Sequence, residues 1–280
     1  MDLWYDTDPG FDDWMAWALL EADPTFRLHG VSVVAGNAPL SVTLANALAI
    51  KAFHGFDTPV YAGCDRPLAQ AQVTAQDVLG AAGMETTGPQ LPATDTKPAP
   101  GHGVLAMIDA VRAHPGSITL LAVGPLTNVA AAFALAPDLP GLLRGLVIMG
   151  GSTTGGNATA AAEFNIHADP EAAARVFDCG VTVDMFGLDV CRQVPIGQPE
   201  VERLRAIGSA RADLFAGYVE GYVAIGRRRG RAVQSLYDPT PVIGLARPEL
   251  FVLQPARVDV ELQGRFTRGM RLKTASGKAM

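Results

Sequence analysis

The stretch Leu-Trp-Tyr-Asp-Thr-Asp-Pro-Gly-Phe-Asp-Asp-Trp-Met-Ala-Trp, residues 3–17, contains a change of pattern that sets the type of fold. The apolar run at residues 3–5 has the character of a buried strand. Pro9 and Gly10 then form a tight turn. Asp12 and Asp13 open a helix whose apolar residues follow directly. The stretch therefore predicts a strand, a turn and a helix in direct succession.

Four carboxylates, those of Asp6, Asp8, Asp12 and Asp13, lie close together in this stretch. Like charges so close cannot all ionise at low cost, so either some of their pKa values are raised or a bound cation offsets the repulsion. Capping of the helix by Asp12 or Asp13 is the alternative, because acids favour the first turn. Capping does not account for Asp6 or Asp8. Oxygen ligands on a flexible loop favour a hard cation, calcium before magnesium.

The composition of the chain argues against several classes of protein. With 280 residues, 49% of them hydrophobic, the chain is long enough for one large α/β domain. Its net charge of -6 and pI near 5.3 argue against a nucleic-acid surface, which needs a concentrated basic patch. The basic run at residues 227–229 with Arg231 is interpreted as the solvated end of a helix, and contact with an anion or substrate is the alternative.

Neither the cysteines nor the N-terminus indicate export. Cys64, Cys179 and Cys191 are odd in number and widely spaced, which is typical of reduced thiols in a cytoplasmic protein. The first residues lack the basic and long apolar regions of a signal peptide. No apolar run approaches the length of a membrane span. We therefore expect a cytoplasmic protein without membrane contact.

Apolar strand patterns alternate with helical patterns through the first two-thirds of the chain. The strands are continuous apolar runs, which are typical of a mainly parallel sheet covered on both faces. We predict an α/β fold, a single domain over residues 1–280 in which helices flank the central sheet. The expected strands after the first are Leu28–Ala35, Pro59–Ala62, Ile118–Ala122, Leu146–Met149 and Val181–Phe186, and the expected helices are Val42–His54, Val104–Ala113, Leu126–Leu135 and Pro170–Phe177.

Polar clusters follow four of the expected strands. Because ligands bind at the carboxyl ends of parallel strands, these clusters predict one shared site. Thr127 and Asn128, within the third cluster, are expected to cap the helix that follows them. The clusters are residues 6–13, 36–37, 123–128 and 150–165.

Three further segments complete the predicted organisation. Residues 63–103 are rich in Gly, Pro, Ala and Thr and weakly periodic, which indicates a long irregular excursion and a candidate lid. Residues 200–229 are helical in pattern, and residues 257–262 are a strand candidate. The tail at residues 265–280 shows no clear apolar period.

Short motifs occur along the chain in a fixed order. The first is DTDPGFDD at residues 6–13, and the later ones are VAGN at 34–37, GPLTN at 124–128, MGG at 149–151, GNAT at 156–159, EFN at 163–165 and DPEAA at 169–173. This ordered set resembles the signature of the calcium-dependent nucleoside hydrolases, the inosine-uridine preferring N-ribohydrolase type. The resemblance covers most of the chain up to about Asp238, which also implies the nucleoside hydrolase fold.

The resemblance implies roles for the residues at matching positions. Calcium (Ca2+) is expected to be bound by Asp8, Asp13, Asp238 and the backbone carbonyl of Val123, where the family commonly has threonine. Structural roles are the alternatives: Asn37 and Asn157, each beside a glycine, as turn residues, Glu163 and Asn165 as part of a surface loop, and Met149 as a core residue. The residues expected around the ribose are Asp12, Asn37, Met149, Asn157, Glu163 and Asn165.

The leaving-group side departs from the family pattern. Tyr237 stands where many members have His, and Leu79 stands at the aligned position of a second His. A phenol with a pKa of ~10 is a weaker acid at neutral pH than imidazolium. Tyr237 is therefore either a stacking surface for the base or a proton donor, and both interpretations stay open.

By resemblance, the expected function is hydrolysis of the N-glycosidic bond of ribonucleosides to free base and ribose, in nucleoside salvage. A calcium-bound water is the expected nucleophile and Asp8 the expected general base. The alternatives are a catalytically impaired nucleoside- or ribose-binding protein of the same fold, and a hydrolase for a modified nucleoside. The expected partners are a small nucleoside substrate and further copies of the chain in a homodimer or homotetramer.

Overall fold

The central sheet brings the carboxyl ends of all its strands to one edge. The structure, a computed structural model, describes residues 1–275. Within these residues six strands form one sheet in the order β3-β2-β1-β4-β5-β6, and each neighbouring pair is parallel. This confirms the predicted sheet. The strands are β1 (Asp2–Thr7), β2 (Arg27–Val33), β3 (Val60–Ala62), β4 (Ile118–Ala122), β5 (Gly145–Met149) and β6 (Val183–Phe186).

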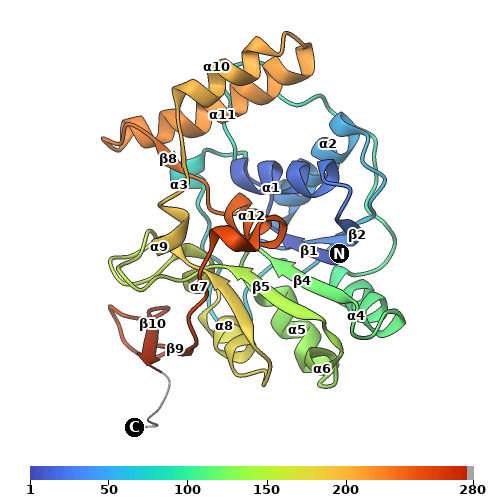
Figure 1. The fold of residues 1–280 in the computed structure, drawn as a ribbon, viewed down its shortest axis with the longest axis vertical. Coiled ribbons are helices and arrows are strands. Elements are labelled where there is room, and N and C mark those ends of the chain that lie inside the picture. The colour runs from blue at the N-terminus through green and yellow to red at the C-terminus, as the bar shows by residue number, and fades with distance from the viewer. Residues whose placement is uncertain (276–280) are drawn as a thin grey trace.

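Helices cover both faces of this sheet (Figure 1), because successive apolar residues of each strand point to opposite sides. Leu3 and Tyr5 belong to one buried core and Trp4 to the other. The first core packs against α1 (Phe11–Ala22), α2 (Leu40–His54), α11 (Ala210–Arg228) and α12 (Pro239–Ala246), and the second packs against α4 (Gly103–Ala113), α5 (Thr127–Leu135) and α8 (Pro170–Phe177).

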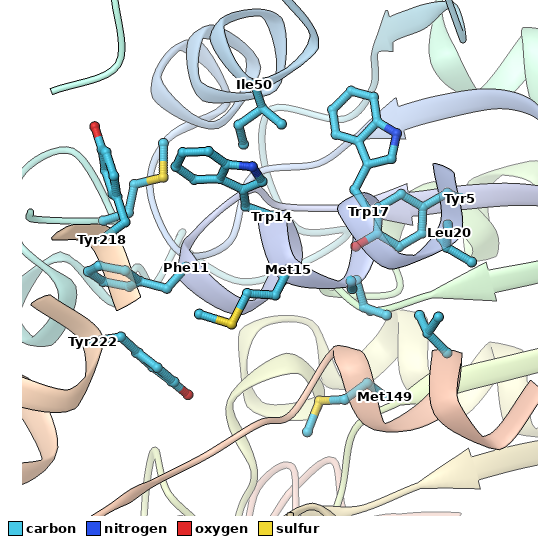
Figure 2. Close-up of a cluster of buried hydrophobic side chains, with 14 of the residues drawn as sticks. Tyr5, Phe11, Trp14, Met15, Trp17, Leu20, Ile50, Met149, Tyr218 and Tyr222 are labelled. Carbon is cyan, nitrogen blue, oxygen red and sulfur yellow. The ribbon is translucent and has the colours of Figure 1, made fainter. Parts of the chain in front are cut away.

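The first core fixes the position of α1, the helix that follows the acidic stretch. Figure 2 shows Trp14 and Trp17 of α1 in this core together with Tyr5 of β1 and Ile50 of α2. The ring of Trp14 lies edge-on to the ring of Tyr218 of α11, with the centroids 5.0 Å apart. Full burial of each large side chain contributes about 3 kcal/mol. The acids at the start of α1 are therefore held on a rigid element.

The boundaries of most elements agree with the sequence pattern, but the stretch at residues 200–229 is divided. It contains α10 (Gln198–Ala206) and α11, with Gly208 between them in a left-handed conformation at φ 70°. Ser209 then caps α11 by accepting a hydrogen bond from the N–H of Ala212. Serine is a favoured N-cap residue, so a new helix begins there. The remaining short elements are α6 (Leu139–Leu142), α7 (Phe164–Ala168), α9 (Leu188–Cys191), β7 (Pro195–Ile196), β8 (Gln234–Ser235) and the 3-10 turn η1 (Pro248–Leu250).

The excursion at residues 63–103 contains the short helix α3 (Gln76–Leu79) and the first residue of α4. The N–H of Leu68 donates to the carboxylate of Asp169 at 2.9 Å, and the N–H of Leu91 donates to the hydroxyl of Tyr218 at 2.8 Å. The excursion is thus attached at the start of α8 and at α11. Its closure over a substrate stays a prediction.

The end of the described chain forms a strand that the sequence pattern did not indicate. β9 (Ala256–Val260) pairs in antiparallel fashion with β10 (Arg271–Ala275), so the tail at residues 265–280 is strand in part. Residues 276–280 lie outside the described residues. No helix in residues 1–275 combines the length and apolar character that a membrane crossing requires.

Thr127 and Asn128 do not cap α5, so that prediction was wrong. The N-cap position is Leu126, and no side chain caps the helix. The hydroxyl of Thr127 donates to Asp169 at 2.7 Å, and the carboxamide of Asn128 donates to Asp6 at 2.8 Å. Both side chains are buried beside the sheet, where polar groups must find partners within the protein.

Candidate active site

Three carboxylates from two distant parts of the chain meet above the sheet. Asp12 and Asp13 open α1, and Asp238 precedes α12. Each of the three offers an oxygen within 4.8 Å of the others. The packing of α1 against α12 brings them together across more than two hundred residues of sequence. Asp12, which the resemblance assigns to the ribose, belongs to this group.

The carboxylate of Asp13 is fixed by four donors. One oxygen accepts from the hydroxyl of Thr7 at 2.5 Å and from the N–H of Asp8 at 3.2 Å. The other accepts from the N–H of Gly10 at 2.9 Å and from the carboxamide of Asn37 at 3.1 Å. The bond to Gly10 also caps α1, so the capping interpretation holds for Asp13 alongside its place in the acidic group.

Asp8 lies beside this group, buried between two glycines. Its Oδ2 accepts the N–H of Asn37 at 2.6 Å. A Cβ atom at Gly36 would lie 2.1 Å from Asp8 Oδ2, and one at Gly124 would lie 2.7 Å from Asp8 Oδ1. Both turns must therefore be glycine for the backbone to approach the carboxylate so closely.

The acids of the site carry raised pKa values because they are buried and lie near one another. Burial, followed by the charge of Asp13, raises the pKa of Asp8 well above its usual range. The same two causes raise the pKa of Asp12 to about 7. Burial and then Asp12 raise the pKa of Asp238. Among the ion pairs of the described residues none involves these acids, so no Lys or Arg offsets their charge.

Asp6 does not join the acidic group, contrary to the expected convergence of all four acids. Its Oδ2 accepts hydrogen bonds from the hydroxyl of Ser32 and the carboxamide of Asn128, and its Oδ1 has no hydrogen-bond partner. Burial raises its pKa to about 7. Asn128 lies on α5, so the side chain of Asp6 is used in packing that helix against the sheet.

The residues after β4 and β5 form a second polar network. The carboxamide of Asn165 donates to the carbonyl oxygen of Val123 at 2.6 Å and to that of Met149 at 3.2 Å. Glu163 caps α7, because its carboxylate accepts the N–H groups of Asn165, Ile166 and Gly151 at 2.9 to 3.1 Å. The predicted metal-ligand carbonyl and three predicted ribose residues therefore share one buried region.

Asn157 is placed differently from the other predicted site residues. It is exposed, on the loop at residues 150–162, and its carboxamide oxygen accepts the N–H of Phe164 at 2.8 Å. No hydrogen bond among the described residues joins it to the acidic group. The structure therefore places Asn157 at the rim rather than in the buried network.

Tyr237 reaches the acidic group through its backbone, and Tyr222 reaches it through its side chain. The N–H of Tyr237 donates to Asp12 Oδ2 at 3.3 Å. The hydroxyl of Tyr222 donates to the carbonyl oxygen of Ser235 at 2.7 Å and lies 3.4 Å from Asp12 Oδ2. Tyr222 lies within the helical pattern at residues 200–229, and nothing in that period distinguishes it from a core residue.

Comparison with known proteins shows the family to which the chain belongs. Residues 3–279 match the family model described as inosine-uridine preferring nucleoside hydrolase. The chain belongs to this nucleoside hydrolase family. It is accordingly an enzyme of the N-ribohydrolase class, which hydrolyses ribonucleosides. The sequence is 38% identical over 280 residues to the non-specific ribonucleoside hydrolase RihC of Escherichia coli O127:H6, covering 99% of this chain and 89% of that protein.

Solved structures of nucleoside hydrolases have the same fold. A plant nucleoside hydrolase, PpNRh1, superimposes with a TM-score of 0.93 at 30% identity, over 100% of this chain and 88% of that one. A purine-preferring ribonucleoside hydrolase from Gardnerella vaginalis gives a TM-score of 0.92 at 28% identity, over 98% and 88% of the two chains. The nucleoside hydrolase described here therefore has the single-domain fold of its family.

Proposed function

We propose that this nucleoside hydrolase cleaves the N-glycosidic bond of ribonucleosides at a calcium site formed by Asp8, Asp13, Asp238 and the carbonyl oxygen of Val123. The proposal rests on the group formed by Asp12, Asp13 and Asp238 with the buried Asp8 beside it, because none of these acids forms an ion pair within residues 1–275. Their mutual repulsion is offset by a divalent cation, and a donor set made only of oxygen suits a hard one. Calcium, when bound, lowers the pKa of a water molecule and fixes its direction.

Asp8 is the proposed general base. Its Oδ2 is occupied by the N–H of Asn37, whereas Oδ1 has no hydrogen-bond partner among residues 1–275. Oδ1 is therefore the atom available to accept a proton. As Asp8 takes this proton, the water oxygen bonds to the anomeric carbon, and the electron pair of the C–N bond leaves with the base.

The ribose is proposed to be held by residues of the two networks described above, together with Asn157 at the rim. Contacts from carboxylates and carboxamides to the sugar hydroxyls strengthen as the ring flattens towards the oxocarbenium-like transition state, so they bind that state more tightly than the substrate. The proposed ribose residues are Asp12, Asn37, Met149, Asn157, Glu163 and Asn165.

Tyr237 is proposed to contact the leaving base without acting as its general acid. Burial, and then the charge of Asp12, raise the pKa of the Tyr237 phenol above its ordinary value. The phenol therefore stays protonated at neutral pH and gives up its proton reluctantly. Stacking of its ring on the base, with hydrogen bonding from the hydroxyl, is the contribution that this chemistry supports.

The test is ribose release, with calcium present, from p-nitrophenyl β-ribofuranoside, inosine, uridine, cytidine and adenosine. The nitrophenolate leaves without a proton, so this substrate tests attack by water and binding of the ribose without the need for a general acid. We expect Asp8→Asn to lower kcat/KM on it by about 10²–10⁴-fold, the usual contribution of a general base. Asp57→Asn, an exposed acid after α2, serves as the control and keeps native activity.

Two results contradict this account. Native turnover in Asp8→Asn removes Asp8 from the chemistry. If the native protein leaves even the activated substrate intact while it binds calcium and ribose, a nucleoside-binding protein becomes the better description.

We also propose that the enzyme works in the cytoplasm as a homodimer or homotetramer, as the family resemblance implies. Three apolar side chains close together in the sequence are largely exposed, those of Leu250, Val252 and Leu253. A subunit contact is one way of covering such residues. Light scattering during size-exclusion chromatography measures the subunit number directly. A monomer at all micromolar concentrations contradicts the proposed assembly.

A further inference from the structure

Asp189 lies on α9, just after the end of β6, and its carboxylate binds the loop at residues 150–162. It accepts hydrogen bonds from the hydroxyl of Ser152 at 3.1 Å, from the N–H of Thr153 at 3.0 Å to each oxygen, and from the hydroxyl of Thr154 at 2.9 Å. Arg192 reaches the same loop at 3.3 Å from the carbonyl oxygen of Gly156. Figure 1 shows α9, which carries Asp189, beside this loop.

This carboxylate accepts four hydrogen bonds from the loop, more than any other side chain of residues 1–275 outside the loop forms with it. The N–H groups of residues 157, 158 and 159 all donate to the carbonyl oxygen of Ala162, which closes the far part of the loop on itself. Burial opposes ionisation of Asp189, but the bonds from Thr153, Thr154 and Ser152 outweigh it and lower its pKa. Asp189 is therefore charged at neutral pH, and charge-assisted bonds are the stronger kind.

The start of the loop contacts Glu163, and its far part, which carries Asn157 at the rim, contacts the first residue of α7. At its start, the N–H of Gly151 donates to Glu163 at 2.9 Å, and the carbonyl oxygen of Gly151 accepts from the N–H of Leu188 at 2.9 Å. Further along, the oxygen of Asn157 is occupied by the N–H of Phe164. No hydrogen bond among the described residues uses the two N–H donors of Asn157, so they are available to a ligand oxygen.

We propose that Asp189 is a positioning residue that holds the loop so that the carboxamide of Asn157 meets the ribose. Asp189 acts through the loop and does not touch the substrate. The inference rests on the proposed function, because it requires that Asn157 contacts the sugar. Without the anchor, the loop samples more conformations, and the binding-competent fraction falls, which raises the apparent dissociation constant by the same factor.

A double-mutant cycle with Asp189→Asn, Asn157→Ala and the combined variant tests the inference, with inosine and uridine as substrates. We expect Asp189→Asn to raise KM about tenfold, with a smaller change in kcat. In the Asn157→Ala background, Asp189→Asn should raise KM by less than about twofold, because the residue through which Asp189 acts is gone. Asp184→Asn on β6, a partly buried acid with no bond to the loop, is the matched control and should leave KM unchanged.

The outcomes separate this inference from the proposed function. If Asn157→Ala is impaired but the effect of Asp189→Asn is additive to it, or if Asp189→Asn keeps native KM, Asp189 is not a positioning residue. If Asn157→Ala itself keeps native kcat/KM, the ribose role of Asn157 fails, and the inference falls with it. Should Asp189→Asn fold poorly, Thr154→Val removes a single donor to the anchor and is expected to raise KM less, with the same dependence on Asn157.

Discussion

Asp13 illustrates how one residue can serve both the fold and the site. Its carboxylate caps α1 through Gly10 and orients the Asp8 loop through the N–H of Asp8 and the carboxamide of Asn37. Four donors fix its oxygens, yet it still lies in the group of three acids. The start of α1 and the proposed calcium site therefore use the same side chain, so a substitution of Asp13 is expected to affect both.

Tyr237 gives the clearest prediction for a single residue. Tyr237→Phe keeps the ring and the backbone N–H that bonds Asp12. It should therefore lower kcat on inosine less than about tenfold, which is below the loss of about 10²–10⁴-fold expected when a general acid is removed. Tyr237→Ala removes the ring and should cost more on every substrate. Steady-state kinetics of both variants measure the difference. A loss of a thousandfold or more in Tyr237→Phe on inosine, with p-nitrophenyl riboside unaffected, identifies Tyr237 as the proton donor.

At the residue scale, sequence reasoning succeeds where functional groups are neighbours in the chain. The crowding of acids at residues 6–13 predicted a group of carboxylates, and the structure places Asp12 and Asp13 together with Asp238. The calcium-binding role of Asp8 and Asp13 comes from the family resemblance and stays a proposal. The contact of the Tyr222 hydroxyl with Asp12 could not be predicted, because Tyr222 occupies an apolar position of a helical pattern. The bonds of Asp189 to the loop could not be predicted either, because Asp189 lies more than thirty positions away from the residues that it bonds. The contact between Asn165 and the carbonyl oxygen of Val123 likewise exists only after β4 and β5 pair.

Among the elements, α1 depends on its contact with the end of α2. The indole N–H of Trp14 donates to Nε2 of His54 at 2.8 Å, so His54 must be neutral at that nitrogen. Burial and the charge of Arg211 lower the pKa of His54 to about 4, against an ordinary value of 6.5. The helix that carries Asp12 and Asp13 is thus held by a hydrogen bond that protonation breaks.

This contact predicts a pH dependence of stability. Between pH 6.5 and 4 the unfolded chain binds a proton at His54 that the folded chain does not, so the free energy of unfolding falls as the pH falls. With allowance for solvent screening at this half-buried site, we expect about 1 kcal/mol of loss from this group between pH 7 and 5. His54→Gln keeps an acceptor for Trp14 but does not titrate, and should lack that loss. Urea unfolding of both proteins at pH 7 and pH 5 measures the free energy of unfolding. If both proteins lose the same free energy between these pH values, His54 is not the cause.

Element types were predictable from the sequence because long apolar strands alternate with periodic helices. Strand β4 and helix α8 agree with the expected bounds at both ends. The failures occur where the signal is short or polar. β10 lies in a polar tail and needs β9 as a partner, and the division of the helical stretch at Gly208 depends on a turn within a continuous pattern.

For the molecule as a whole, the parallel order of the sheet accounts for the site. Because all six strands run the same way, the loops after β1, β2, β4, β5 and β6 emerge at one edge. A common region is therefore reached by the acids that follow β1, the glycines that follow β2 and β4, and the loop after β5 that Asp189 holds. The plant and Gardnerella nucleoside hydrolases share this fold.

The most direct measurement is a calcium titration of protein stripped with a chelator, in which ion binding and ribose release from uridine are followed together. We expect no turnover without a cation, a single calcium ion bound per chain, and activity that rises in proportion to the fraction of protein with calcium bound. Asp238→Asn should shift both curves to higher calcium concentration by the same factor. Full turnover in excess chelator, or activity that rises without calcium binding, contradicts the account.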